Sequence, residues 1–326
     1  MYGYEILHED IMDNLIKNVR RGYFCHAYIF EGEKGIGSLE AALLFSNALI
    51  CERTEVAPCG ACSACILAKA GNHPDIHIIS PLKDKKNILV EQIRDLSKDA
   101  YTKPFENAKK VYIIQYGDEM NEQSQNALLK LLEEPPEYAV FVILSENTES
   151  LLPTVRSRCE LMKFPPVSPQ EIENILKRDY PDIKNADFLA RCSGGNIKKA
   201  RQLAEDEDFI PLRSGAFETL TKLLSSDIYE SYEIADFVEA NKEHAEAILD
   251  LWTEMLRDIM LIQNGKKALA VNADYIDRLS DLALMIDEKK TVDAIQYILS
   301  AQEMLRRHVK LRTLILKASF GIKKGV

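Results

Sequence analysis

The sequence has few of the features that mark membrane, secreted or fibrous proteins. Its 326 residues contain one tryptophan, no internal repeat and no low-complexity tract. No run of about 18 apolar residues is present, and the opening MYGYEILHEDIMDNLIK carries acids where a secretory signal has a basic stretch before an apolar one. We therefore expect a chain with no membrane span and no signal peptide, located in the cytoplasm.

Positive charge is also scarce. The chain has 41 Lys and Arg against 51 Asp and Glu, a net charge of -10. Because phosphate binding needs clustered Lys and Arg, this argues against a protein whose whole surface binds nucleic acid, although partners could supply that binding. Of seven cysteines, four lie between Cys51 and Cys65, and an odd total with three scattered residues is typical of a reduced, cytosolic chain.

The order of apolar segments predicts an α/β domain followed by helices. Strands that are apolar throughout and separated by helical patterns indicate a parallel sheet with helices on both faces. After these strands Ser168, Pro169 and Glu171 form a predicted capping box, and only helical patterns follow. We predict an α/β domain at 1–165, a small helical lid domain at 166–207 and a helical domain at 208–326. The predicted strands are HAYIF (26–30), IHII (76–79), VYII (111–114), AVFVIL (139–144) and LMKF (161–164).

The stretch GEKGIGSL has the glycines of a phosphate-binding loop. Gly32 and Gly37 have the required spacing, with Gly35 between them, after a predicted strand and before a predicted helix. Such a loop needs a Lys for the phosphates and a Ser or Thr for Mg²⁺, but these two positions hold Ser38 and Leu39. We expect a degenerate loop without tight Mg-ATP binding; a plain strand-to-helix turn is the alternative.

The second half of an ATPase site is missing as well. A strand ending in Asp-Glu would hold the metal and polarise water, but the strand VYII is followed by Gln115 and Tyr116. Asp118 and Glu119 come later, and we expect them to begin the next helix. Joint loss of both halves favours a non-hydrolysing relative of an ATPase.

Four cysteines form the candidate metal site. Cys51, Cys59, Cys62 and Cys65 on a short excursion can complete a closed, tetrahedral, structural Zn²⁺ site. Iron–sulfur ligation and unmetallated thiols are the alternatives. His73 could replace one ligand, but we expect a solvated loop histidine.

Two basic features have both a plain and a functional interpretation. Arg158, in SRC, is either a surface arginine paired with an acid or an arginine finger that reaches a neighbouring subunit's nucleotide, and the tripeptide alone favours the first. The C-terminal excess of positive charge could meet DNA or an acidic partner, although a packed helix with a solvated basic face is favoured. That excess comprises Arg306, Arg307, Lys310, Arg312, Lys317, Lys323 and Lys324.

Several segments together resemble the bacterial clamp-loader AAA+ family. They are HAYIFEGEKGIG, the cysteine cluster, GNHPD, KVYIIQYGDEMNEQSQNALLKLLEEPP and TVRSRC. The motifs extend to about residue 205, and beyond it only length and helical character match. The resemblance implies zinc at the four cysteines, Arg158 as a finger for the ATP site of an adjacent gamma/tau subunit, and Lys198 at the position of a sensor arginine.

The resemblance also implies a role and partners. The helical C-terminal domain would join a pentameric collar with gamma/tau and delta subunits, while neighbours bind the ATP. The complex, part of the DNA polymerase III holoenzyme, would load a sliding clamp on primed DNA. Ser38, Leu39, Gln115 and Tyr116 favour a non-hydrolysing stator over the alternative, an ATP-hydrolysing gamma/tau-type subunit. A zinc-dependent DNA-binding module is a further alternative.

Overall fold

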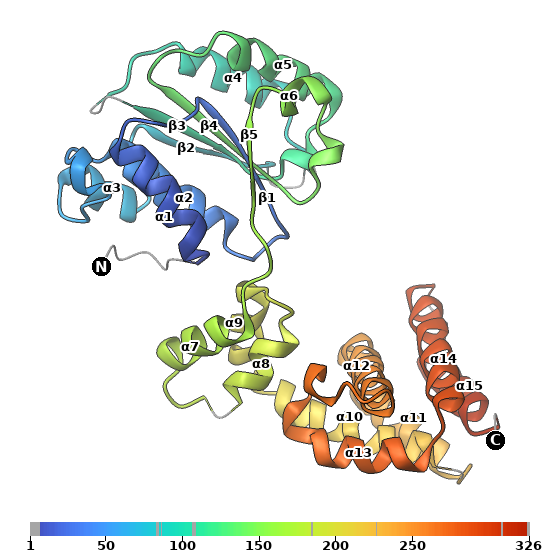
Figure 1. The fold of residues 1–326 in the computed structure, drawn as a ribbon. Coiled ribbons are helices and arrows are strands. Elements are labelled where there is room, and N and C mark those ends of the chain that lie inside the picture. The colour runs from blue at the N-terminus through green and yellow to red at the C-terminus, as the bar shows by residue number, and fades with distance from the viewer. Residues whose placement is uncertain are drawn as a thin grey trace. The chain divides into compact units, whose positions relative to one another are not determined.

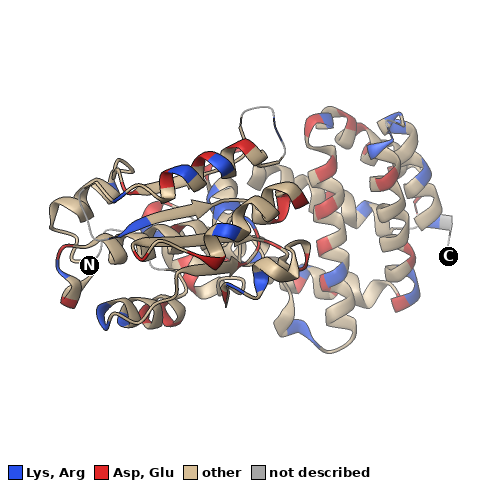
Figure 2. Ribbon diagram, turned by 90° about the horizontal axis from the view of Figure 1, so that it is seen from above, with Lys and Arg blue, Asp and Glu red and all other residues tan. Residues whose placement is uncertain are grey.

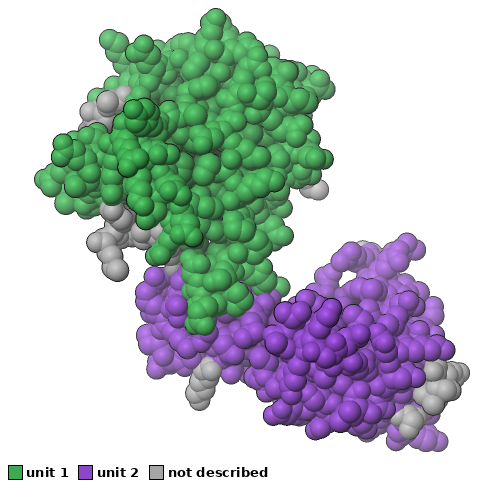
Figure 3. All heavy atoms as spheres, viewed as in Figure 1, with its two compact units in different colours: residues 1–172, 194–199 green, residues 173–193, 200–326 purple. Residues whose placement is uncertain are grey.

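The protein, analysed as a computed structural model, divides into two compact units. Residues 1–172 with 194–199 form the first, and residues 173–193 with 200–326 form the second (Figure 3). The structure describes residues 7–82, 85, 87–105, 109–183, 185–225, 227–307 and 309–324. None of the helices in these ranges is long and apolar enough to span a membrane.

A five-stranded parallel sheet of order β2-β3-β4-β1-β5 forms the centre of the first unit. Side chains alternate between its faces, so Tyr28 and Phe30 enter one core and Ala27 and Ile29 enter the other. The predicted strands are confirmed to within one residue at each end. The strands are β1 (Ala27–Glu31), β2 (Ile76–Ile79), β3 (Lys110–Ile114), β4 (Ala139–Ser145) and β5 (Glu160–Lys163).

Helices cover both faces of this sheet, as Figure 1 shows. Met12, Phe45 and Ala64 place the first group, α1 to α3, in one core, whereas Ile93 and Leu128 place α4 and α5 in the other, where α6 also packs. One group is α1 (Glu9–Arg20), α2 (Ser38–Ile50) and α3 (Ser63–Lys69), with the 3₁₀ turn η1 (Thr54–Val56). The other is α4 (Val90–Ala100), α5 (Glu122–Glu133) and α6 (Pro153–Arg156), with turns η2 (Gly117–Glu119) and η3 (Thr148–Ser150).

After β5 the described chain is helical throughout, which confirms the predicted fold class. The Ser168 Oγ accepts from the Glu171 N–H at 3.2 Å, as the predicted cap requires. The boundaries near 165 and 207 stay predictions. The helices are α7 (Pro169–Asp179), α8 (Ala186–Cys192), α9 (Ile197–Glu205), α10 (Phe209–Leu224), α11 (Glu230–Ala240), α12 (Ala245–Gln263), α13 (Ile276–Met285), α14 (Glu288–Arg306) and α15 (Leu311–Lys324), with turns η4 (Lys242–His244), η5 (Lys267–Leu269) and η6 (Ala273–Tyr275).

The second unit packs around α12. Its Ile248, Trp252, Met255 and Ile259 are buried on one face of the helix, at the spacing of an amphipathic helix. The only tryptophan of the chain, Trp252, donates its indole N–H to the Ala216 carbonyl of α10 at 2.8 Å. Its burial makes this residue a selective spectroscopic reporter of the second unit.

Candidate functional site

The glycine loop joins β1 to α2. Gly35 and Gly37 have φ of 90° and 103°, the left-handed region that glycine tolerates. A Cβ on Gly37 would collide with the buried Leu7, so the turn also needs glycine for space. At the position of the phosphate-binding lysine, Ser38 is 9% exposed and starts α2, and the next residue, Leu39, packs against the core.

Distant segments brace the loop carbonyls. The Asn196 side-chain amide donates to the Lys34 carbonyl at 2.6 Å, and the Lys198 backbone N–H donates to the Gly35 carbonyl at 3.1 Å. His8 Nε2 lies 2.9 Å from the Ile36 carbonyl oxygen. The residue at the sensor-arginine position, Lys198, thus contacts the loop through its backbone.

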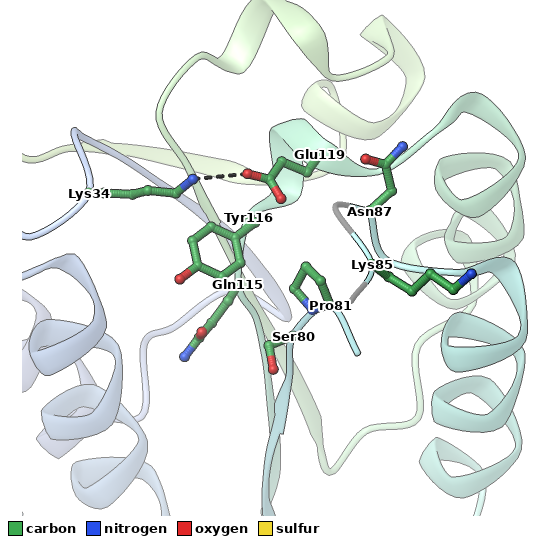
Figure 4. Close-up of a pocket in the computed structure, with 8 residues that line it drawn as sticks. All are labelled: Lys34, Ser80, Pro81, Lys85, Asn87, Gln115, Tyr116 and Glu119. Carbon is green, nitrogen blue, oxygen red and sulfur yellow. Dashed lines mark hydrogen bonds and ion pairs between the residues drawn. The ribbon is translucent and has the colours of Figure 1, made fainter. Parts of the chain in front are cut away.

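Lys34 makes its charge contacts within the protein. Its Nζ lies 2.9 Å from Glu119 Oε1, 3.5 Å from Glu146 Oε1 and 4.4 Å from the centre of the Tyr116 ring. The hydrogen bond that Lys34 donates to Glu119 raises the pKa of Lys34 above its usual value. Figure 4 shows Lys34 pointing toward Glu119. Both residues line an open cavity of about 740 Å³, together with Ser80, Pro81, Lys85, Asn87, Gln115 and Tyr116.

A tight turn follows β3, at the position where an active ATPase site has Asp-Glu. Gln115 and Tyr116 follow β3, and Tyr116 takes a positive φ of 57°. The expectation that Asp118 and Glu119 begin the next helix is wrong. They lie in η2, while Asn121 caps α5 by accepting the Ser124 N–H at 2.9 Å.

The four cysteines converge on one point. Cys51 ends α2, Cys62 caps α3 and Cys65 lies in its first turn, and all four Sγ atoms are within 4.8 Å of one another. The Cys51–Cys62 and Cys59–Cys65 Sγ pairs are 4.0 and 3.9 Å apart. Tetrahedral sulfurs about 2.3 Å from one zinc ion lie roughly 3.8 Å apart, so the cluster fits one ion.

The surroundings of the sulfurs suit thiolates. Backbone N–H groups of Cys59, Cys62 and Cys65 each donate to another cysteine's Sγ at 3.4 Å. The Ala61 N–H lowers the pKa of Cys59 to about 6, whereas burial raises the pKa of Cys51 and of Cys65. One cation would offset that burial cost for all four thiolates.

His73 is not a solvated histidine, contrary to expectation. His73 is buried, with only 4% of its surface exposed, and its Nδ1 accepts the Asp75 N–H at 3.1 Å. Among the described residues it does not belong to the group that could hold a metal. The His73 side chain therefore orders the backbone of the loop before β2.

Arg158 lies in the turn between α6 and β5. Its Nη2 is 2.7 Å from Glu133 Oε1 at the end of α5, and its Nη1 donates to the Thr154 carbonyl at 2.8 Å. The side chain is 33% exposed. Next to it Cys159 points into the core, where burial raises its pKa to about 12.

Four basic residues of the C-terminal segment, Arg306, Arg307, Arg312 and Lys323, form ion pairs with acids. Acidic and basic residues are interspersed along the helices (Figure 2). Lys323 is 5% exposed and donates to the Lys222 and Ser225 carbonyls at the end of α10. These contacts agree with a packed helix rather than a free basic surface; the Lys324 side chain lies outside the described residues. The pairs are Arg306 with Glu246, Arg307 with Glu303, and Arg312 with Asp236 and Glu239.

A parallel sheet in this order, with a glycine loop after β1 and helices after β5, agrees with the AAA+ fold class expected from the sequence. Residues 7–168 match the family described as "DNA polymerase III, delta subunit". The chain is 31% identical over 320 residues to DNA polymerase III subunit delta′ of Bacillus subtilis, covering 97% of this chain and 96% of that protein. The chain belongs to the family of DNA polymerase III delta′ subunits.

Two further relatives are also DNA polymerase III subunits, one of them delta′ and the other tau. The delta′ subunit of Escherichia coli is 26% identical over 322 residues, which cover 96% of this chain and 95% of that protein. The tau subunit of Escherichia coli is 29% identical over 255 residues, which cover 74% of this chain and 39% of tau. The resemblance to the clamp-loader family is confirmed, and the relatives narrow it to the delta′ subunit.

Proposed function

We propose that this chain is the non-hydrolysing delta′ subunit of a clamp loader. It assembles with gamma/tau and delta subunits in a hetero-pentamer, within the DNA polymerase III holoenzyme in the cytoplasm. There it acts as a stator while the complex loads a sliding clamp on primed DNA. ATP is bound by its neighbours, and the isolated chain catalyses no reaction.

One observation carries this proposal. This chain, a member of the delta′ family, has Ser38 and Leu39 at the two positions where ATP binding needs a lysine and a metal-binding hydroxyl. The alternative, a gamma/tau-type ATPase, requires the chain to hydrolyse Mg-ATP alone. The Lys34 contacts to Glu119 and Glu146 support the absence of turnover, because they neutralise a nearby lysine of the loop.

In this proposal Arg158 completes the ATPase site of an adjacent gamma/tau subunit. Its guanidinium is partly exposed at the end of the α/β sheet domain and is held by one carboxylate, Glu133. Exposed pairs of this kind contribute only about 0–1 kcal/mol, so the guanidinium can exchange Glu133 for a phosphate at little cost. An arginine supplied in trans can accelerate phosphoryl transfer by about 10³ to 10⁵.

Reconstitution with gamma/tau and delta tests this role. We expect Arg158→Ala to reduce turnover at the adjacent site by about 10³ or more, and total DNA- and clamp-stimulated ATPase to fall by that site's share. Arg156→Ala, which removes an exposed arginine two residues away, is the matched control and should retain full activity. Unchanged ATPase in an intact Arg158→Ala assembly would refute the arginine-finger role.

We also propose that Cys51, Cys59, Cys62 and Cys65 hold a structural zinc ion. The sulfur spacing and the N–H donors support one four-coordinate ion with no open position. When bound, zinc would supply cross-linking rather than Lewis-acid chemistry, tying the end of α2 to α3. An iron–sulfur cluster, a larger body than one ion, is disfavoured by sulfurs this close together.

A further inference from the structure

Three charged side chains lie beside the glycine loop and form what we call the ion cluster: Lys34, Glu119 and Glu146. Lys34 Nζ is 2.9 Å from Glu119 Oε1 and 3.5 Å from Glu146 Oε1. The Tyr116 ring lies against the same ammonium, with its centre 4.4 Å away. The ammonium is thus bound by two carboxylates and an aromatic ring.

The ion cluster joins the ends of three neighbouring strands. Lys34 lies in the loop after β1, Glu146 follows β4 directly, and Glu119 lies in η2 after β3. Asp118 Oδ1 accepts the Glu146 N–H at 3.2 Å and ties two of these segments together. Open α/β sheets bind their ligands outside the carboxyl ends of the strands. The ion cluster therefore lies in the region where an ATPase of this class binds its nucleotide.

The charge of the ion cluster opposes anions. One ammonium and two carboxylates sum to a formal charge of +1 − 2 = −1. A phosphate that approaches the loop would have to compete with two carboxylates for Lys34 and would meet their negative charge beside it. Loss of the lysine at position 38 removes attraction, whereas these carboxylates add repulsion.

We propose that the ion cluster closes the glycine loop to phosphate, with Glu119 and Glu146 as the residues that determine this exclusion. The inference deepens the proposed non-hydrolysing function and rests on it. It gives a role to Lys34, which does not occupy the lysine position of a phosphate-binding loop. Removing the two carboxylates should release Lys34 and convert the loop into a weak site for polyphosphate anions.

Calorimetric titration of the full chain with inorganic tripolyphosphate, and separately with Mg-ATP, tests the inference. We expect Glu119→Gln/Glu146→Gln to bind tripolyphosphate at least about tenfold more tightly than wild type, the factor one charge-assisted contact provides. The Glu146→Gln single variant, which keeps the Glu119 hydrogen bond, should be intermediate. Adding Lys34→Ala should abolish the gain.

A matched control separates the ion cluster from net charge. Glu122→Gln/Glu149→Gln makes the same change of charge at two exposed acids nearby, and should bind like wild type. Three results would each overturn this inference without overturning the proposed function. They are an equal gain in tripolyphosphate affinity in this control, a gain that survives Lys34→Ala, and no gain in a folded Glu119→Gln/Glu146→Gln variant. Mg-ATP turnover by the wild-type chain would overturn the proposed function together with it.

Discussion

Arg213 of α10 is 2% exposed, yet it carries a full charge in the second unit. Its guanidinium donates to Asp274 at 2.7 and 2.8 Å and to Asn272 at 2.8 Å, and it stacks on the Phe188 ring, 3.4 Å from the ring centre. Asn272 is held in turn by the buried Asp258. A buried charge that makes four hydrogen bonds orders three segments that are distant in sequence.

We expect Arg213→Met to destabilise the second unit by about 3 kcal/mol, because it leaves Asn272 and Asp274 without their donor. Methionine keeps an apolar side chain between the Phe188 and Tyr275 rings, against which the guanidinium packs. Urea unfolding followed by Trp252 fluorescence measures the effect, since this indole reports the second unit. Arg312→Met, at an exposed pair with Asp236 and Glu239, is the control and should change stability by less than about 1 kcal/mol.

At the scale of elements, the segment from the end of α2 to the end of α3 has little regular structure apart from η1 and α3. Its cysteines Cys51, Cys62 and Cys65 belong to the same core as α1 and α2. Glu52 accepts from the Ser63 hydroxyl and the Ala64 N–H and orients the start of α3. A metal ion bound to four residues of this short, loop-rich segment would order it.

Elemental analysis should therefore find one zinc per chain, and Cys62→Ser should lose it. At a free zinc concentration about a thousand times the Kd, the ion stabilises the native state by roughly 4 kcal/mol, which chelation or Cys62→Ser would remove. Cys25→Ser, at an exposed cysteine outside the cluster, should keep both metal and stability. Protein that purifies without zinc and whose stability does not rise when zinc is added, or zinc-loaded protein whose urea midpoint matches that of Cys62→Ser, would contradict the proposal.

At the scale of the whole molecule, we expect a histidine on β2 to contribute to acid sensitivity. His77 stacks on Tyr112 with ring centres 5.0 Å apart, and its Nε2 lies 3.5 Å from Asp99 Oδ2. Burial lowers the pKa of His77 below its usual 6.5, and Lys110 lowers it further, while Asp99 partly opposes this. Between the folded and unfolded pKa values the unfolded chain binds more protons, so stability falls as pH drops through 6.5 and then levels off below the folded pKa.

We expect His77→Phe, which keeps an aromatic ring on Tyr112 but cannot titrate, to flatten this pH dependence. Urea midpoints from far-ultraviolet circular dichroism at pH 7.5, 6.5 and 5.5, roughly one unit to either side of the unfolded pKa, measure the slope. His244→Phe, at an exposed histidine of η4, should retain the wild-type slope. Equal slopes in wild type and His77→Phe would show that another group controls acid stability.

Much of the architecture was predictable because it depends on local patterns. The five strands and the cap at Ser168 follow from apolar runs and capping residues, which act within a few positions. The cysteine spacing likewise places all four sulfurs together without knowledge of the sheet. The errors, at His73 and at Asp118 with Glu119, concern loop residues whose burial and hydrogen bonding are decided by contacts outside the motif.

The sequence by itself determined that the glycine loop lacks a lysine and a hydroxyl, and that both halves of an ATPase site are absent. Only the tertiary structure decided what lies there instead. Lys34 meets Glu119 across 85 positions, and Asn196 reaches the same loop across 162. The order of the sheet brings the ends of β1, β3 and β4 together, and charges that are far apart along the chain become neighbours only there.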